Sequence, residues 1–339
     1  MLMIITRPIF GRSTAPSLCI LLISATTMAC AQSTAPLQLE KTIELSDVQG
    51  RIDHMSLDIK GERLFVAALG NNTIEVVDLK TGKRVNTISG LKEPQGVLYV
   101  PGANRLYVAN GEDGTVRVFD ASSLKELKSL AYGDDADNLR YDSGKQHIYV
   151  GFGSGGLGEF DMDGRRIAET KLDAHPESFQ LEKNGPRIYV NLPKSLKIAV
   201  VDRDKHTVIA TWRTGGPQAN YPMTLNEADH RLFVVTRFPA RLIVFNTEAG
   251  KVIQSLPAVG DCDDVFYDQN RKRIYASGGE GAISVFEQQS IDQYKEVARI
   301  ATVKGARTSL FSPELRRLYL AVRREGSHSA MIQVFVPKP

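Results

Sequence analysis

One hydrophobic pattern returns along most of the chain. Each copy begins with a basic residue, continues with Leu or Ile and an aromatic residue, and ends with small, mostly apolar residues. The copies recur every 40 to 44 residues, a spacing typical of four-stranded propeller blades. The seven copies are Arg63-Leu-Phe-Val-Ala, Arg105-Leu-Tyr-Val-Ala, His147-Ile-Tyr-Val-Gly, Arg187-Ile-Tyr-Val-Asn, Arg231-Leu-Phe-Val-Val, Arg273-Ile-Tyr-Ala-Ser and Arg317-Leu-Tyr-Leu-Ala.

Each repeat divides into four short strands separated by turn residues. Apolar and polar residues alternate within the strands, and no segment between the copies keeps a period near 3.6 residues. Parallel β/α barrels are therefore disfavoured. In the second repeat the predicted strands are 97–100, 105–109, 115–119 and 126–130.

The two ends of the chain predict how the ring of blades closes. The last repeat ends with a third strand at 331–335 and lacks a fourth, whereas an extra strand at 37–45 precedes the first inner strand. Pairing of the extra strand with the last repeat would satisfy two open sheet edges. We therefore predict an all-β fold, a seven-bladed propeller of four-stranded antiparallel blades in which the N-terminal strand completes the last blade.

The repeats also resemble a known family. The stretches "RLYVANGEDGTVRVFDASSLK" and "RLFVAALGNNTIEVVDLKTGKRV", with "EPQGVLYVP" between them, are similar to the YVTN-type repeats of the YncE-like family of exported bacterial proteins. The resemblance extends from about Leu37 to the end of the chain and implies the propeller fold. It implies binding functions, DNA binding among them, without one shared reaction. WD40 repeats fit less well because their Gly-His and Trp-Asp markers are missing.

The first residues predict an export signal. Two arginines precede the apolar run 18–23, which is too short to span a bilayer, and small residues follow as far as Ala31. Cleavage after Ala31 would leave a single propeller domain, residues 32–339, in the periplasm or outside the cell. Lipid attachment at Cys30 is the alternative, and it fits less well because Thr27 stands three places before the cysteine.

Charge and cysteine content narrow the possible functions. Loss of residues 1–31 removes two arginines and no acidic residue, so the net charge falls from +3 to +1. A nearly neutral chain disfavours a broad nucleic-acid-binding surface.

Cys262 is the one cysteine of residues 32–339, so this domain has no internal disulfide. The acidic neighbours of Cys262 would raise its thiol pKa, which favours an inert side chain.

The repeat register brings distant polar residues to one face of the ring. In a four-stranded meander, the links between blades and the turns between second and third strands lie on the same face. Ten residues before each basic residue of the pattern, the inner strand is expected to begin near the axis. These positions hold Asp53, Gln95, Asp137, Glu177, Tyr221, Asp263 and Arg307, and the next positions hold His54, Gly96, Asn138, Ser178, Pro222, Asp264 and Thr308.

We expect both of these sets of seven positions to lie near the mouth of the axial channel. Strand alternation leaves open which member of each adjacent pair faces the axis, and strand ends in water can be polar without binding anything. Together these residues predict a ligand-binding site. Its candidate residues are Asp53, His54, Gln95, Asp137, Asn138, Glu177, Tyr221, Asp263, Asp264 and Arg307.

Carboxylate and amide oxygens in this ring suit Ca²⁺, Mg²⁺ or Mn²⁺. The candidate ligands are Asp137, Asn138, Glu177 and Asp263, although no contiguous metal-binding motif supports them. His54, next to Asp53, is the candidate general base if the protein is an enzyme. His175 lies on the same link between blades as Glu177 and could join it.

Three functions are compatible with these residues. The first is an exported binding protein that holds a small polar or charged ligand, or a partner protein, at the channel mouth. The second is a metal-dependent enzyme of the lactonase or lyase type, with its site on the propeller axis. The third is binding of single-stranded nucleic acid, which the net charge disfavours.

Overall fold

The seven repeats form seven sheets, each of four antiparallel strands, as the repeat pattern predicts. The computed structural model describes residues 2–6, 8, 11, 35–326 and 328–339. Most of the predicted signal segment, including Cys30 and Ala31, lies outside these residues. Within the described residues, none of the helices has the length and apolar character needed to cross a bilayer.

Six blades take their four strands in chain order. The first three comprise β2 (Met55–Asp58), β3 (Arg63–Ala68), β4 (Thr73–Asp78) and β5 (Lys83–Ile88); β6 (Pro94–Val100), β7 (Arg105–Asn110), β8 (Thr115–Asp120) and β9 (Glu126–Ala131); β10 (Leu139–Asp142), β11 (His147–Phe152), β12 (Gly156–Asp161) and β13 (Arg166–Lys171). The next three comprise β14 (Phe179–Leu181), β15 (Arg187–Leu192), β16 (Lys197–Asp202) and β17 (Thr207–Arg213); β18 (Gln218–Asn226), β19 (Arg231–Phe238), β20 (Ala240–Asn246) and β21 (Lys251–Pro257); β22 (Cys262–Asp268), β23 (Arg273–Gly278), β24 (Ala282–Ser290) and β25 (Gln293–Ala301).

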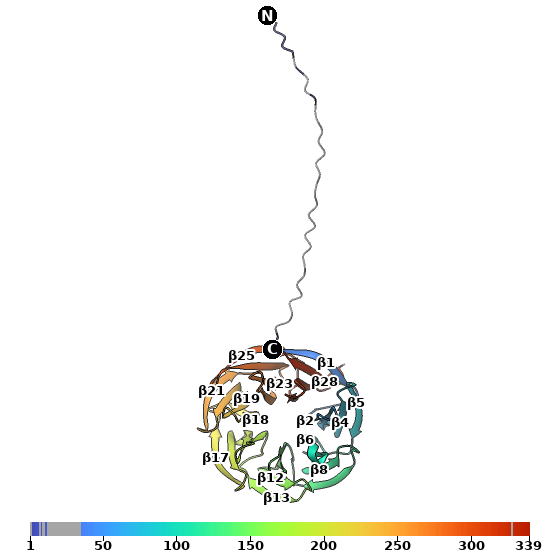
Figure 1. Cartoon of the computed structure of the whole chain (residues 1–339), viewed down its shortest axis with the longest axis vertical. Helices are drawn as coiled ribbons and strands as arrows, with labels where there is room; N and C mark the ends of the chain where they lie inside the picture. Colours follow the sequence, from blue (N-terminus) through green and yellow to red (C-terminus); the bar gives the residue numbers. More distant parts are fainter. Residues whose placement is uncertain (1, 7, 9–10, 12–34, 327) are drawn as a thin grey trace. The chain divides into compact units, whose positions relative to one another are not determined.

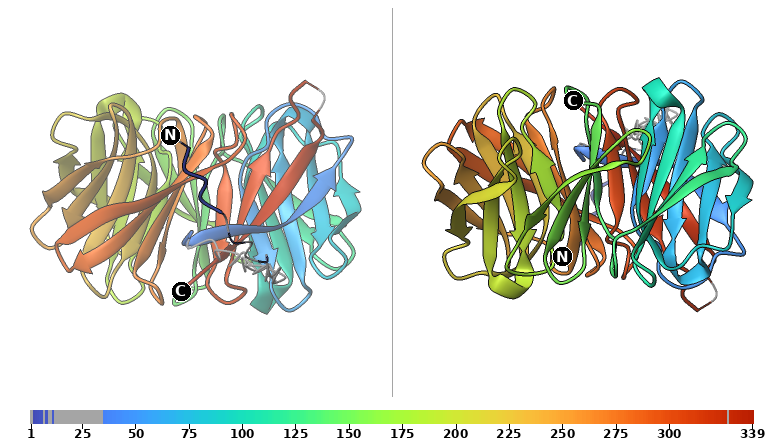
Figure 2. Two further views of the ribbon diagram at one scale, coloured as in Figure 1. Left: turned by 90° about the horizontal axis from the view of Figure 1, so that it is seen from above. Right: turned by 90° about the horizontal axis from the view of Figure 1, so that it is seen from below.

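The seventh blade joins the two ends of the domain. It comprises β26 (Ser309–Ser312), β27 (Arg317–Val322), β28 (Ala330–Pro337) and, as its outer strand, β1 (Leu37–Leu45). Three short 3₁₀ turns, Leu69–Asn71, Pro101–Ala103 and Pro193–Ser195, lie within the repeats. Figure 1 shows the blades as a ring, with β2, β6 and β18 toward the centre and β5, β13 and β21 at the rim. Figure 2 shows the same ring from its edge.

Strand β1 closes the ring as predicted. It pairs antiparallel with β28, with Leu37 opposite Pro337 and Ile43 opposite Ile332. The ladder has a single irregularity, between Leu39 and Lys41. The free edge of the last blade is thereby covered by the first strand of the domain. The last sheet therefore has four strands, like the other six.

The hydrophobic core lies between blades. Buried apolar residues of the described chain fall into seven clusters, and each cluster joins two neighbouring blades. One of them joins Leu64 and Val66 of the first blade to Tyr319 and Ala321 of the last. Because each blade is packed on both sides, each of them depends on the closure of the ring.

The repeated basic-apolar-aromatic motif contributes to this packing directly. Its aromatic side chain is at most 3% exposed in all seven copies. Its basic residue joins blades: Arg63 pairs with Asp58 at 2.7 Å and donates a hydrogen bond to the carbonyl oxygen of Ala121 in the next blade. His147 lies 2.6 Å from Glu159 Oε1 on the neighbouring strand of its own blade, so this histidine makes a structural contact within the blade.

The closing strand provides a test of this architecture. Ile43 is 1% exposed in the cluster between the first and last blades, so Ile43→Ala should lower the free energy of unfolding by about 2–5 kcal/mol. Glu44→Ala, at an exposed position of the same strand, should change it by less than about 0.5 kcal/mol. Urea denaturation measures both values, and equal effects of the two substitutions would contradict closure by β1.

Candidate functional site

A β-bulge at the entrance of the inner strands turns two consecutive side chains toward the axis. Asp53 N donates to Ala67 O at 2.7 Å, and Ala67 N donates to His54 O at 3.0 Å, so two residues oppose one. The same pattern places Asp137 and Asn138 opposite Gly151, and Glu177 and Ser178 opposite Asn191. In these three blades, both residues of each adjacent pair therefore line the channel.

The bulge also corrects one expectation. The inner strands were expected to begin at the polar positions themselves, but β2, β10, β14 and β26 begin two residues later. In β6, β18 and β22 the strand starts earlier, and its register shifts at the same level. The regular ladder begins only after the extra residue has been accommodated.

The ring positions meet in a recess of about 270 Å³, which we call the mouth cavity. Nine of the ten predicted site residues line it, and Asp264 lines the neighbouring cavity below. This arrangement is geometrical; the ligand-binding roles stay predictions. The lining residues are Arg51, Asp53, His54, Gln95, Asp135, Asp137, Asn138, His175, Glu177, Ser178, Lys194, Tyr221, Arg237, Asp263 and Arg307.

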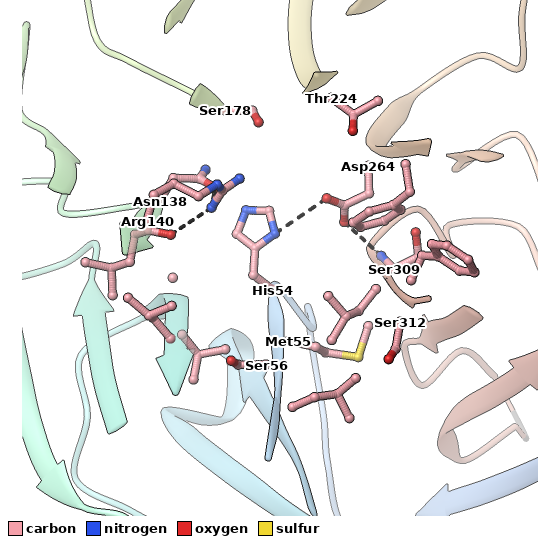
Figure 3. A pocket seen from close by; sticks show the side chains of 18 of the residues that line it. His54, Met55, Ser56, Asn138, Arg140, Ser178, Thr224, Asp264, Ser309 and Ser312 are labelled. Atoms are coloured by element: carbon pink, nitrogen blue, oxygen red, sulfur yellow. Dashed lines mark hydrogen bonds and ion pairs between the residues drawn. The ribbon is translucent and has the colours of Figure 1, made fainter. Parts of the chain in front are cut away.

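A second recess of about 400 Å³, the axial cavity, is lined by residues from all seven inner strands. His54, Asn138 and Ser178 line both cavities. Figure 3 shows the His54 side chain between two polar groups, with Asp264 on one side and Asn138 with Arg140 on the other. His54 Nδ1 lies 3.8 Å from Asp264 Oδ1, beyond hydrogen-bond distance.

One wall of the mouth cavity holds a compact network of paired charges. Asp263 accepts hydrogen bonds from Arg237 at 2.5 Å on one oxygen and contacts Arg307 at 2.9 Å with the other. Asp261 also pairs with Arg307, at 2.8 Å, and Arg237 stacks on Tyr221 with 3.9 Å to the ring centre. Because both oxygens of Asp263 are engaged by guanidinium groups, its predicted role as a metal ligand loses support.

The opposite wall holds carboxylates without such partners. Asp137 is 6% exposed, and among the described residues no hydrogen bond or ion pair reaches its carboxylate or that of Glu177. Burial, with Asp53 and Asp135 adding to it and His54 opposing it, raises the pKa of Asp137 to about 7. Burial and the same acidic surroundings raise the pKa of Glu177 well above its usual value. A cation would relieve this unfavourable arrangement.

His175 stands beside these two carboxylates. Its Nδ1 lies 2.6 Å from the carbonyl oxygen of Gly153 and 3.5 Å from Asp135 Oδ2. One nitrogen or oxygen atom from each of Asp137, His175 and Glu177 lies within 4.8 Å of the others. Two of these three residues, Asp137 and Glu177, belong to the predicted metal set, and His175 joins them in a group whose ligand atoms lie close together.

The sequence interpretation missed Arg51 and Asp135. Both lie twelve residues before a basic residue of the repeat, two places ahead of the predicted ring. The same position holds His175 and Asp261 in other repeats, so a second row counted at this spacing would have found all four. Lys194, which reaches the cavity from the 3₁₀ turn between β15 and β16, follows no such spacing.

Cys262 lies behind the charged network and not within it. Its side chain is fully buried in the cluster between the fifth and sixth blades, and its Sγ lies 3.4 Å from the carbonyl oxygen of Asp264. Burial, followed by the charges of Asp264 and Asp263, raises the pKa of this thiol well above its usual value. The thiol is thereby kept in its unreactive protonated form.

Asp264 predicts a pH dependence of stability. Burial, opposed by the Ser309 N–H and Arg140, raises the pKa of Asp264 well above its usual value, and Asp263 and Asp53 raise it further. A carboxyl group whose pKa is raised in the folded state contributes stability at low pH that is lost as the pH rises through the folded-state pKa. Asp264→Asn stays neutral, so its thermal midpoint relative to the parent protein should be higher at pH 8 than at pH 5.

The size of this effect follows from the linkage between pKa and stability. Each unit by which the pKa is raised corresponds to about 1.4 kcal/mol, so we expect a relative gain of at least about 1 kcal/mol. Asp263→Asn is the comparison variant: it leaves Arg237 and Arg307 without their shared partner and should lower the midpoint at pH 8. Melting curves at both pH values measure the difference, and a gain that does not grow with pH would contradict the assignment.

Known proteins show the same architecture but give no functional identification. No family model and no curated protein matches the chain. A chain of the hydrazine synthase of Kuenenia stuttgartiensis matches with 17% identity and a TM-score of 0.70, covering 82% of this chain and 95% of its own length. A chain in the crystal structure of the mitotic checkpoint complex matches with 14% identity and a TM-score of 0.74, covering 98% of both chains. At these identities the likeness shows the propeller fold alone.

Proposed function

We propose that this protein is a binding propeller that holds a small charged molecule in the mouth cavity. The observation that carries this proposal is the separation of charge within one recess. Asp137 and Glu177 lie on one wall without ion-pair partners among the described residues, whereas Arg237 and Arg307 lie on the other. The ligand's cationic group faces the first wall and its anionic group faces the second.

The size and depth of the recess favour a small ligand over a partner protein. A volume of about 270 Å³ is near the lower end for ligand pockets, and the key carboxylate of Asp137 is almost completely buried. Such a group is accessible to a small molecule entering the channel but not to a flat protein surface. Molecules of the size of an amino acid or a short organic acid fit this description best.

The alternative functions have weaker support in the geometry. A hydrolytic or lyase reaction would use His54 as a base, but its nearest carboxylate contacts, Asp53 and Asp264, are both at 3.8 Å. Single-stranded nucleic acid requires several exposed aromatic side chains. On the mouth face of the described chain, Phe238 is 69% exposed, while the Tyr221 ring is covered by Arg237.

We also propose that the protein works outside the cytoplasm. The charged, apolar and small-residue segments of residues 1–31 support removal of this segment during export. The similarity of the repeats to the YncE-like family supports the same location.

Ligand binding can be tested with a small panel of charged probes. The panel comprises glutamate, lysine, glycine betaine, putrescine and succinate, screened by thermal shift and then by calorimetry in the presence of EDTA. We expect a probe with both charges to bind, and Asp137→Asn/Glu177→Gln to weaken its binding at least about tenfold, because a charged hydrogen bond contributes about 1.5–3 kcal/mol.

The matched control removes the same two charges from the outer surface. Asp163→Asn/Glu169→Gln changes exposed residues of the third blade and should leave binding unchanged. The proposal fails if none of the probes binds either with or without EDTA, or if the variant of the mouth cavity binds as tightly as the parent protein.

Export can be tested by mass spectrometry of the protein recovered from its native cells. The expected first residue is Gln32, after cleavage at Ala31. A lipid-modified Cys30 at the N-terminus would instead show the lipoprotein alternative. Recovery of the intact chain from the cytoplasm would contradict export.

A further inference from the structure

Asp137 is an unusual residue in this structure because a nearly fully buried carboxylate normally has a partner. It is 6% exposed, and among residues 35–326 and 328–339 no hydrogen bond or ion pair reaches its side chain. The carboxylate lines the mouth cavity, so it is directed at a space and not at another protein group. Such a group indicates a ligand that the protein binds from solution.

The chain holds Asp137 in this position through a close backbone contact. A Cβ atom on Gly96 would lie 2.0 Å from the carbonyl oxygen of Asp137, so only glycine permits this approach between the second and third blades. This contact fixes the backbone position of Asp137, from which its side chain extends into the mouth cavity.

His175 is held in the tautomer that a metal ion requires. A carbonyl oxygen can only accept a hydrogen bond, so the contact of 2.6 Å with Gly153 O places the proton on Nδ1. Nε2 is then left with its lone pair, and Asp135 at 3.5 Å from Nδ1 strengthens the same arrangement. Metal-binding histidines typically donate their other ring N–H to a carbonyl or a carboxylate in this way.

Glu177 is placed beside His175 by the local sequence His-Pro-Glu. His175 and Glu177 lie two residues apart on the link before β14, and Pro176 restricts the backbone between them. One carboxylate oxygen from each of Asp137 and Glu177 and one ring nitrogen of His175 lie within 4.8 Å of one another. Ligands that share one ion at about 2.1 Å lie about 3–4 Å apart, so small side-chain rotations complete the site.

We propose that Asp137, His175 and Glu177 bind a divalent first-row transition metal ion of the zinc class. One imidazole nitrogen and two carboxylates suit Zn²⁺ and Mn²⁺, whereas Ca²⁺ and Mg²⁺ prefer oxygen ligands alone. Three protein ligands leave at least one coordination position open, and this position faces the cavity that contains Lys194, Arg237 and Arg307.

The inference deepens the proposed function, on which its role in ligand binding rests. The metal ion would be the cationic centre on the acidic wall, and an anionic ligand such as a carboxylate would bind to the open position. The site itself does not depend on that ligand, because the metal alone can bind to the three residues.

Calorimetric titration of the chelator-treated full-length protein tests the site directly, with ZnCl₂, MnCl₂ and CaCl₂ as probes. We expect Zn²⁺ to bind with a stoichiometry of one and Ca²⁺ to bind at least tenfold more weakly. His175→Gln and Asp137→Asn should each weaken Zn²⁺ binding at least tenfold. The control His230→Asn removes an exposed histidine from outside the channel and should leave the affinity unchanged.

A second measurement covers the case in which the variants fold poorly. X-ray absorption at the zinc edge of the parent protein should show one nitrogen and two or more oxygen ligands. The inference is overturned if no stoichiometric Zn²⁺ binds, if His175→Gln binds Zn²⁺ as tightly as the parent, if His230→Asn loses the binding, or if Ca²⁺ binds equally well.

The outcomes separate this inference from the proposed function. If Zn²⁺ binds but no small molecule binds with or without it, the metal site stands and the proposed function fails. If a molecule with both charges binds in EDTA and no Zn²⁺ binds, the proposed function stands and the metal site is rejected. Succinate binding that requires Zn²⁺ supports both.

Discussion

Apolar packing between neighbouring blades is the interaction on which the rest of this structure depends. The core is divided into seven clusters that each span two blades, and the cluster between the first and last blades exists only because β1 pairs with β28. A single blade buries one side of its sheet only in contact with the next one. Closure therefore determines both the stability of the domain and the meeting of seven strand starts at one mouth.

Within this frame, the β-bulge determines what the mouth contains. Regular alternation would direct one of each two consecutive residues into a blade, but the bulge turns Asp137 and Asn138 toward the channel together. The mouth thus receives more polar groups than seven regular strands would supply. The consequence is a crowded set of charges, of which some are paired and others are not.

The sequence predicted the fold well because the relevant information is repeated. Seven copies of one motif fix the number of blades, and the complementary ends at 37–45 and 331–335 fix the closure, all of which the structure confirms. The spacing of the repeats also identified residues that lie together in the structure, since nine of the ten candidates line the mouth cavity. What the register could not predict is pairing: Asp263 and Asp137 occupy equivalent positions, yet two arginines hold the first and none holds the second. That difference depends on Arg237, which lies near the end of β19, outside the counted rows.

A repeated fold acquires a specific site by breaking its own symmetry, and the geometry of the ring limits where this can happen. Neighbouring blades bring equivalent positions side by side, and across the narrow channel His54 of the first blade also comes within 3.8 Å of Asp264 of the sixth. Asp137 and Glu177 stand in the third and fourth blades, one repeat apart, and His175 belongs to the same link as Glu177. The arginine-rich network occupies the fifth to seventh blades. Arg237 and Arg307 are engaged by Asp261 and Asp263 of their own wall, so among the described residues no arginine is left to pair with the carboxylates of Asp137 and Glu177.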